Sequence, residues 1–180
     1  MTKTNPVPVL EFQPPAPIPP EYLNDRYTSI FLAGSIEQNV ATQWQQRVVR
    51  MFKGYRNVVL FNPRRAAWDS SWKNVASNPM FREQVEWELD SLTVTDVILM
   101  YFDPATKSPI SLFETGLFAN DGETLRVDGK MQRVSKLHVV CPPGFWRKGN
   151  VDIVCEHYGI RQYPNIKQAV DAIKNIYRLS

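Results

Sequence analysis

Short apolar runs alternate with longer amphipathic stretches along most of the chain, and this alternation restricts the possible folds more than any other feature. The run Asp96–Phe102 (DVILMYF) is typical of a strand that is buried on both faces. Strands that alternate with helices are joined by right-handed crossover connections, which place the strands parallel to one another. We therefore predict one α/β domain built on a parallel sheet.

The strands and helices can be assigned from these patterns. The predicted strands are Ser29–Ala33, Asn57–Phe61, Asp96–Phe102, Lys136–Cys141 and, with a weaker pattern, Ile160–Tyr163. The predicted helices are Ala41–Phe52, Met80–Leu92, Ile110–Ala119, Val151–Tyr158 and Ile166–Tyr177. This order predicts a flavodoxin-like, doubly wound, five-stranded parallel sheet with helices on both faces. The polar stretch Asn120–Arg133 is predicted to be a surface excursion.

Proline is concentrated at the start of the chain, where seven of the fourteen prolines fall between Pro6 and Pro20. This stretch has neither a helical nor an alternating pattern, so it is expected to be extended or mobile. We predict a proline-rich arm over residues 1–26 and a single domain over residues 27–180.

Composition excludes several classes of protein. No secretion signal and no apolar run of membrane-spanning length is evident, so we expect a cytoplasmic protein whose two cysteines are reduced. The formal net charge is only +3 and the basic residues are scattered. Such a weak bias gives no reason to expect a nucleic acid polymer as a partner.

In doubly wound sheets, ligands bind at the carboxyl ends of the strands, and polar or aromatic residues follow each of the first four predicted strands. The residues that we single out there are Gly34, Ser35, Asn62, Arg64, Trp68, Asp69, Trp72, Asp103, Ser108, Ser111, Glu114, Arg147 and Lys148. Neither a GxGxxG fingerprint nor a P-loop lysine follows the first strand. No cofactor is therefore predicted.

Most of these residues allow a functional and a purely structural interpretation. Gly34 could let the backbone approach a ligand, or could simply turn the chain into the next helix. Trp68 and Trp72 could stack on a flat ring, or could cover the sheet while Asp69 caps a turn. Arg147 could hold a phosphate together with its basic neighbour, or could simply be solvated. His138 and His157 lack partners at ligand spacing, so no metal is predicted.

Glu114 is expected in about the first turn of a helix, where backbone amides and the helix dipole would keep a carboxylate ionised and nucleophilic. The plainer reading is that it favours the helix start. A second carboxylate could come from the preceding helix, whose packed side we expect at Leu89 and Leu92. Glu88 and Asp90, near the end of that helix, are the candidates. A carboxylate pair is what glycosyl transfer requires.

Four segments carry a resemblance to the nucleoside 2-deoxyribosyltransferase family: LFNPRRAAWDSSW, FREQVEWELD, YFDPATKSPISLFETGLFA and CPPGFWRKGNVDIVC. The family's fold is flavodoxin-like. Its catalytic Glu lies in a small-x-x-Glu-x-Gly motif, which Ser111–Gly116 matches. The resemblance therefore implies that Glu114 is the nucleophile of a double displacement at C1′. It also implies a homo-oligomer in which neighbouring subunits complete each active site.

The resemblance implies a nucleoside or nucleotide and a free nucleobase as substrates, with transfer of a (2-deoxy)ribosyl group and hydrolysis as a side reaction. The acidic partner corresponds to Glu88, with Asp90 as the rival. Six residues before the nucleophile the transferases carry Asp, whereas this chain has Ser108, which is similar to relatives that hydrolyse nucleoside 5′-monophosphates. A 5′-monophosphate N-glycosidase and a non-catalytic nucleotide-binding module are the alternatives.

Overall fold

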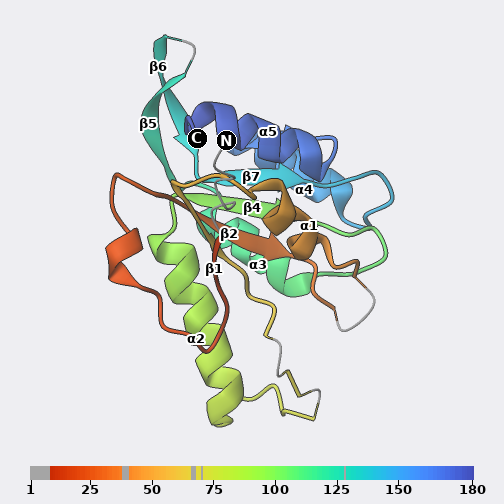
Figure 1. Cartoon of the computed structure of the whole chain (residues 1–180). Coiled ribbons are helices and arrows are strands. Elements are labelled where there is room, and N and C mark those ends of the chain that lie inside the picture. Colours follow the sequence, from red (N-terminus) through yellow and green to blue (C-terminus); the bar gives the residue numbers. More distant parts are fainter. Residues whose placement is uncertain (1–8, 38–40, 66–67, 70, 128) are drawn as a thin grey trace.

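The computed structural model describes residues 9–37, 41–65, 68–69, 71–127 and 129–180, and its centre is a six-stranded parallel sheet (Figure 1). The strand order is β1-β3-β2-β4-β7-β8. The strands are β1 (Leu10–Phe12), β2 (Thr28–Gly34), β3 (Val58–Phe61), β4 (Val97–Tyr101), β7 (Leu137–Val140) and β8 (Arg161–Tyr163). Chain order runs one way from β2 to β3 and the other way from β4 to β8, which confirms the doubly wound, flavodoxin-like prediction.

Within the described part of the chain, five α-helices cover the two faces of the sheet (Figure 1). They are α1 (Trp44–Met51), α2 (Pro79–Val94), α3 (Pro109–Phe118), α4 (Lys148–Tyr158) and α5 (Ile166–Ile176). Helices α1 and α5 share one apolar cluster with the sheet, and α2, α3 and α4 share the other. The five helices were all predicted, and their ends differ from the prediction by at most three residues.

The alternation of side chains along each strand explains why both faces are apolar. In β2, Phe31 and Ala33 belong to the cluster under α2, α3 and α4, whereas Ile30 and Leu32 belong to the cluster under α1 and α5. A strand that must bury both faces offers few positions for a polar residue, and this produces the nearly continuous apolar runs in the sequence. Asn78 begins α2 by accepting hydrogen bonds from the amides of Met80 and Phe81.

The prediction of five strands missed the edge strand β1, which comes from the proline-rich arm. Residues 10–12 pair in parallel with β3 at Val59–Phe61, and Ile18, Tyr22 and Leu23 pack against the core. A three-residue strand is too short to show an alternating pattern, so only its partner strand reveals it. Residues 1–8 lie outside the described part, and the domain boundary at residue 27 stays a prediction.

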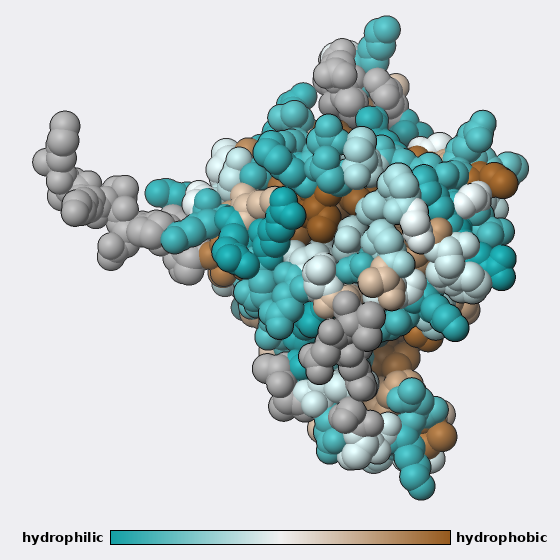
Figure 2. Space-filling view, turned by 90° about the vertical axis from the view of Figure 1, so that its right-hand side faces the viewer, coloured by the Kyte–Doolittle hydropathy of each residue, from teal (hydrophilic) through white to brown (hydrophobic). Residues whose placement is uncertain are grey.

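The predicted surface excursion forms an antiparallel hairpin of β5 (Gly122–Val127) and β6 (Lys130–Ser135), which projects from the sheet in Figure 1. The face turned to the viewer in Figure 2 is mainly hydrophilic, with separate apolar areas between the polar residues. Among the described residues, no helix combines the length and the apolar character needed to cross a membrane.

The packed side of α2 differs from the prediction. Leu92 is buried, but Leu89 is 40% exposed, and Gln84, Trp87 and Ser91 complete the buried side. The spacing of these four residues follows one helix face, as the helical period requires. The prediction considered hydrophobicity alone. Gln84 and Ser91 are buried although they are polar, because they lie on the helix face that packs against the sheet, whereas Leu89 lies outside that face.

Candidate functional site

The winding of the sheet reverses between β2 and β4, and three buried hydroxyl groups meet at the carboxyl ends of these two strands. The Oγ of Ser35, which follows β2, lies 2.5 Å from the Oγ of Ser108, at the start of α3. Thr106 Oγ1 donates to Ser35 Oγ at 2.9 Å and lies 2.7 Å from Ser108 Oγ. The structure therefore brings together Ser35 and Ser108 at the point where doubly wound folds bind ligands.

Asp103 contacts the hydroxyl cluster through its backbone and holds the adjoining loop through its side chain. Its backbone amide donates to Ser35 Oγ at 2.8 Å, and its carboxylate accepts hydrogen bonds from the amides of Ala105 and Thr42. These bonds commit both carboxylate oxygens to the backbone. Asp103 thus shapes the loop between β4 and α3.

The side chains of Glu37 and Trp146 form hydrogen bonds to the backbone of the same loop. Glu37 Oε1 accepts the amide hydrogens of Lys107 at 2.9 Å and of Ser108 at 2.6 Å. Trp146 Nε1 donates to the carbonyl oxygen of Lys107 at 2.9 Å. Ser108 itself has a left-handed backbone, with φ of 44°, so the tight loop demands an unusual conformation that these bonds stabilise.

Glu114 lies in the second turn of α3, as its sixth residue, and not in the first turn as expected. The free amides and the favourable dipole are confined to the first turn, so they do not keep this carboxylate ionised. The side chain is only 8% exposed. Burial, together with the negative charge of Glu88, raises the pKa of Glu114 to about 8.

Glu88, on α2, is the carboxylate that interacts with Glu114. Burial raises the pKa of Glu88 to about 7, against the opposing effect of a hydrogen bond from Gln84. Gln84 Nε2 donates both to Glu88 Oε1 at 2.7 Å and to the carbonyl oxygen of Pro63 at 2.9 Å. The two carboxyl groups therefore titrate as a pair, because loss of the first proton near neutral pH makes loss of the second less favourable.

Asp90 is placed elsewhere. It is exposed on α2 and lines a surface groove together with Pro17, Ile18 and Trp87, whose indole donates to the carbonyl of Ala16. Helical geometry explains the difference, because two residues along a helix rotate a side chain by about 200°. Glu88 and Asp90 cannot both face Glu114.

Gly34 has a structural reason to be glycine. Its φ is +131°, and a Cβ added there would lie 2.1 Å from the carbonyl oxygen of Tyr101 on the neighbouring strand. No other residue can occupy this position while β2 pairs with β4. The glycine therefore allows a close approach of two backbone segments, and the segment that it approaches is β4 and not a ligand.

Asn62 and Arg64, after β3, are engaged with protein groups. Asn62 donates to Glu11 at 2.7 Å, and this bond connects the end of β3 to the arm. Asn62 also accepts from the amide of Arg64. Arg64 donates to Gln45 at 2.9 Å and to the carbonyl of Thr42, and burial lowers its pKa. Both residues thus hold the loop in place.

The two tryptophans of this loop pack edge to face, with 5.0 Å between the ring centroids of Trp68 and Trp72. Arg65 lies over the Trp72 ring and forms an ion pair with Glu83 on α2. Asp69 accepts from Ser71, a turn contact that lowers its pKa. Ala66, Ala67 and Ser70 of the same segment lie outside the described residues. The contact with Ser71 matches the interpretation of Asp69 as a residue that caps a turn. Trp68 is partly exposed.

The basic residues after β7 do not form a joint site. The guanidinium of Arg147 lies 4.3 Å from the ring centroid of Trp146, and Lys148 is paired with Asp152 at 2.7 Å. Arg147 is nevertheless next to the indole that contacts Lys107. Ser111 is buried one turn before Glu114, and its carbonyl accepts from Thr115.

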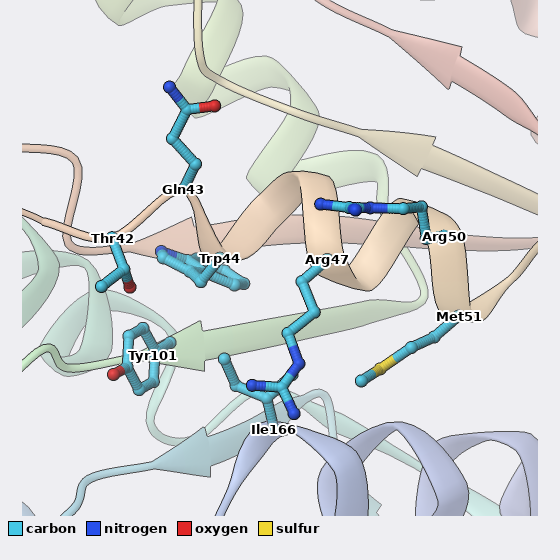
Figure 3. A pocket seen from close by; sticks show the side chains of 8 residues that line it. All are labelled: Thr42, Gln43, Trp44, Arg47, Arg50, Met51, Tyr101 and Ile166. Carbon is cyan, nitrogen blue, oxygen red and sulfur yellow. The ribbon is translucent and has the colours of Figure 1, made fainter.

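A separate open pocket of about 690 Å³ lies between α1 and α5 (Figure 3). Its lining includes Trp44, Arg47, Arg50, Tyr101 and Ile166. None of the described residues that line it is a carboxylate, and it lies on the sheet face opposite α3. Within the described ranges, no group of His, Cys, Asp or Glu is arranged to hold a metal ion.

Sequence reasoning missed four groups of the site: Glu37, Gln84, Thr106 and Trp146. Only Gln84 left a usable signal, because it precedes Glu88 by four residues, the spacing at which helical side chains meet. The contacts of Glu37 and Trp146 join segments about 40 or more residues apart. Such contacts leave no local pattern.

Comparison with known protein families identifies the family of this chain. A search of curated proteins found no match. A comparison with protein families matches residues 27–127, more than half of the chain, to the family described as nucleoside 2-deoxyribosyltransferase like. The matched range contains Ser35, Glu88, Ser108 and Glu114. The family match over more than half of the chain, together with the doubly wound sheet, shows that this chain belongs to the nucleoside 2-deoxyribosyltransferase-like family.

Proposed function

We propose that the protein transfers a 2-deoxyribosyl group between nucleobases through a covalent glycosyl-Glu114 intermediate, with hydrolysis as a side reaction. The observation that carries this proposal is the pair formed by Glu114 and Glu88, whose pKa values are both raised. A shared proton leaves one carboxylate to attack and one carboxylic acid to protonate the leaving group.

In the first step, a Glu114 carboxylate oxygen forms a bond to C1′ while the bond from C1′ to the base nitrogen breaks. The electron pair of that bond goes to the departing base, which takes the proton held by Glu88. This step requires the shared proton to lie on Glu88. Positive charge that develops at C1′ favours the ionised form of the nearby Glu114, and so favours this arrangement.

In the second step, a nitrogen of the incoming base attacks C1′ and displaces the Glu114 carboxylate. The proton released by the incoming base returns to Glu88. Water in place of the base gives the free sugar. The first step needs an acid and the second needs a base, so a carboxyl group with a pKa near 7 suits both roles.

The decisive assay incubates the protein with deoxyinosine and adenine, and separately with the corresponding 5′-monophosphates, and separates the products by chromatography. We expect deoxyadenosine from the first mixture. Free base from the monophosphates alone would identify a 5′-monophosphate N-glycosidase, the activity suggested by Ser108. Absence of any product would identify a non-catalytic binding module.

We also propose that the protein forms a homo-oligomer. Ile110, Phe113 and Leu117 line the outer face of α3 at a spacing of three and four residues, and are 64%, 61% and 52% exposed. An apolar stripe on the outside of a helix is suited to a second copy. We expect Phe113→Glu to shift the wild-type oligomer toward monomer in sedimentation velocity, because a charge there would be desolvated.

The equally exposed Met131, on the hairpin, supplies the control variant Met131→Glu. Both variants add one negative charge, so only a local effect separates them. A wild-type protein that sediments as a monomer at all concentrations would contradict the proposal.

A further inference from the structure

The loop that leads into α3 carries a feature that the proposed chemistry does not use: a carboxylate of the same chain accepts hydrogen bonds from two of its amides. Glu37 Oε1 accepts from the amides of Lys107 and Ser108, at 2.9 Å and 2.6 Å. Successive backbone amides in a tight loop can form a concavity that binds an anion such as phosphate. In this chain, the two amides directly before α3 are already bonded to a negatively charged group.

The hydroxyl of Ser108 is also engaged. It meets Ser35 Oγ at 2.5 Å and Thr106 Oγ1 at 2.7 Å, and all three residues are at most 4% exposed. Thr106 additionally contacts the carbonyl oxygen of Asp103 at 2.9 Å. The three hydroxyl protons thus have acceptors inside the protein. The Ser108 hydroxyl is therefore almost fully enclosed by protein groups.

Ser108 is the N-cap residue of α3 and Glu114 lies within that helix, which places Glu37 relative to the reaction. Six residues of helix correspond to a rise of about 9 Å. When C1′ of a nucleoside lies at Glu114, the 5′ end of its sugar can extend toward the start of α3. A 5′-hydroxyl can donate a hydrogen bond to a carboxylate, whereas a 5′-phosphate dianion has no proton to donate and is repelled by it.

We propose that Glu37 is a specificity-determining residue that selects nucleosides and rejects nucleoside 5′-monophosphates at the Glu114 site. This inference rests on the proposed function. Glu37 acts in two ways: its charge repels a phosphate, and its carboxylate occupies the two amides that would bind one. Ser108 alone therefore does not make this chain a monophosphate hydrolase.

The test compares kcat/KM for deoxyinosine with kcat/KM for deoxyinosine 5′-monophosphate. We expect the wild type to prefer the nucleoside at least tenfold. Glu37→Gln keeps an oxygen for the two amides but removes the charge, so the preference should fall at least fivefold, mainly through a lower KM for the monophosphate. Glu37→Asp keeps the charge and should retain most of the preference.

Glu156→Gln is the matched control, because Glu156 is exposed on α4 and the substitution changes the net charge equally. It should leave the preference unchanged. Inorganic phosphate provides a second measurement: millimolar phosphate should inhibit Glu37→Gln and leave the wild type unaffected. A ratio of two substrates is insensitive to a general loss of activity in the variant.

Each outcome separates this inference from the proposed function. If the wild type releases base but prefers the monophosphate, or if Glu37→Gln keeps the wild-type preference, the role of Glu37 is refuted and the glycosyl chemistry stands. If neither substrate yields base, the proposed function is refuted. Titration calorimetry with inorganic phosphate then decides the role of Glu37 alone, since only Glu37→Gln should bind it. Should Glu37→Gln fail to fold, the wild-type preference and Glu37→Asp decide.

Discussion

Glu114→Gln is expected to release base at least about 10³-fold more slowly than the wild type, because an amide is neither anionic nor nucleophilic enough to attack C1′. Gln has nearly the same shape as Glu, so the packing of α3 against the sheet should be preserved. Release rates are measured by chromatography with deoxyinosine as substrate, and folding is checked by circular dichroism. Glu156→Gln serves as the control.

A covalent intermediate offers a direct measurement for the same variant. Acid-quenched wild-type protein should show the mass of one added deoxyribosyl group, and Glu114→Gln should show none. A variant that still releases base at a rate comparable to the wild type would disprove the nucleophile assignment.

The same substitution should stabilise the protein at high pH. The unfolded Glu114 releases its proton near pH 4.5, whereas the folded side chain holds it up to about pH 8. The folded state therefore binds more protons across this window, and the free energy of unfolding falls as pH rises through it. One pKa unit corresponds to about 1.4 kcal/mol. We expect the melting temperature of Glu114→Gln to exceed that of the wild type at pH 8, by a margin that shrinks toward pH 5.

Glu88→Gln is expected to lower kcat about 10²-fold or more for bases that leave poorly, and much less for activated leaving groups. A general acid contributes most when the departing nitrogen is strongly basic. The measurement is kcat for a series of nucleosides whose bases differ in the pKa of the departing nitrogen. The slope of log kcat against that pKa should become steeper in the variant.

The pH profile of Glu88→Gln gives an independent test. Wild-type activity requires the pair to hold one proton, so the profile should fall on both sides of a maximum between about pH 7 and 8. In the variant, the negative charge that raises the pKa of Glu114 is gone. Its acid limb should therefore move to lower pH, and its basic limb should disappear.

Asp90→Asn is the matched control, since it removes a carboxylate two residues away on the same helix. Its exposed position beside Pro17 and Ile18 predicts a small effect. Small and equal effects from Glu88→Gln and Asp90→Asn would mean that neither residue is the acid.

The sequence alone was sufficient for the parallel, doubly wound sheet. Buried central strands such as β4 must be apolar on both faces, and that requirement is visible in VILMY without any knowledge of the neighbours. The choice of Glu114 as nucleophile came from its motif and was likewise local. The edge strand β1 was missed, because three residues pair with β3 through backbone groups that every residue possesses.

Electrostatics and long-range contacts required the tertiary structure. From sequence, Glu114 was expected to be an ionised carboxylate at a helix start, yet burial and the charge of Glu88 raise its pKa instead. The choice between Glu88 and Asp90 depended on which face of α2 packs against the sheet. That face could not be predicted from hydrophobicity, because polar Gln84 and Ser91 lie on it.

Local patterns thus determined which segments become strands and helices, because that property depends on residues a few positions apart. The assignment of the attacking carboxylate came from a short motif and stays a prediction. Only the tertiary structure decided which charges meet. The bonds from the start of α3 to Glu37, and the interaction of Glu88 with Glu114, join separate segments of the chain. Their strength depends on burial and distance, and neither quantity exists until the chain has folded.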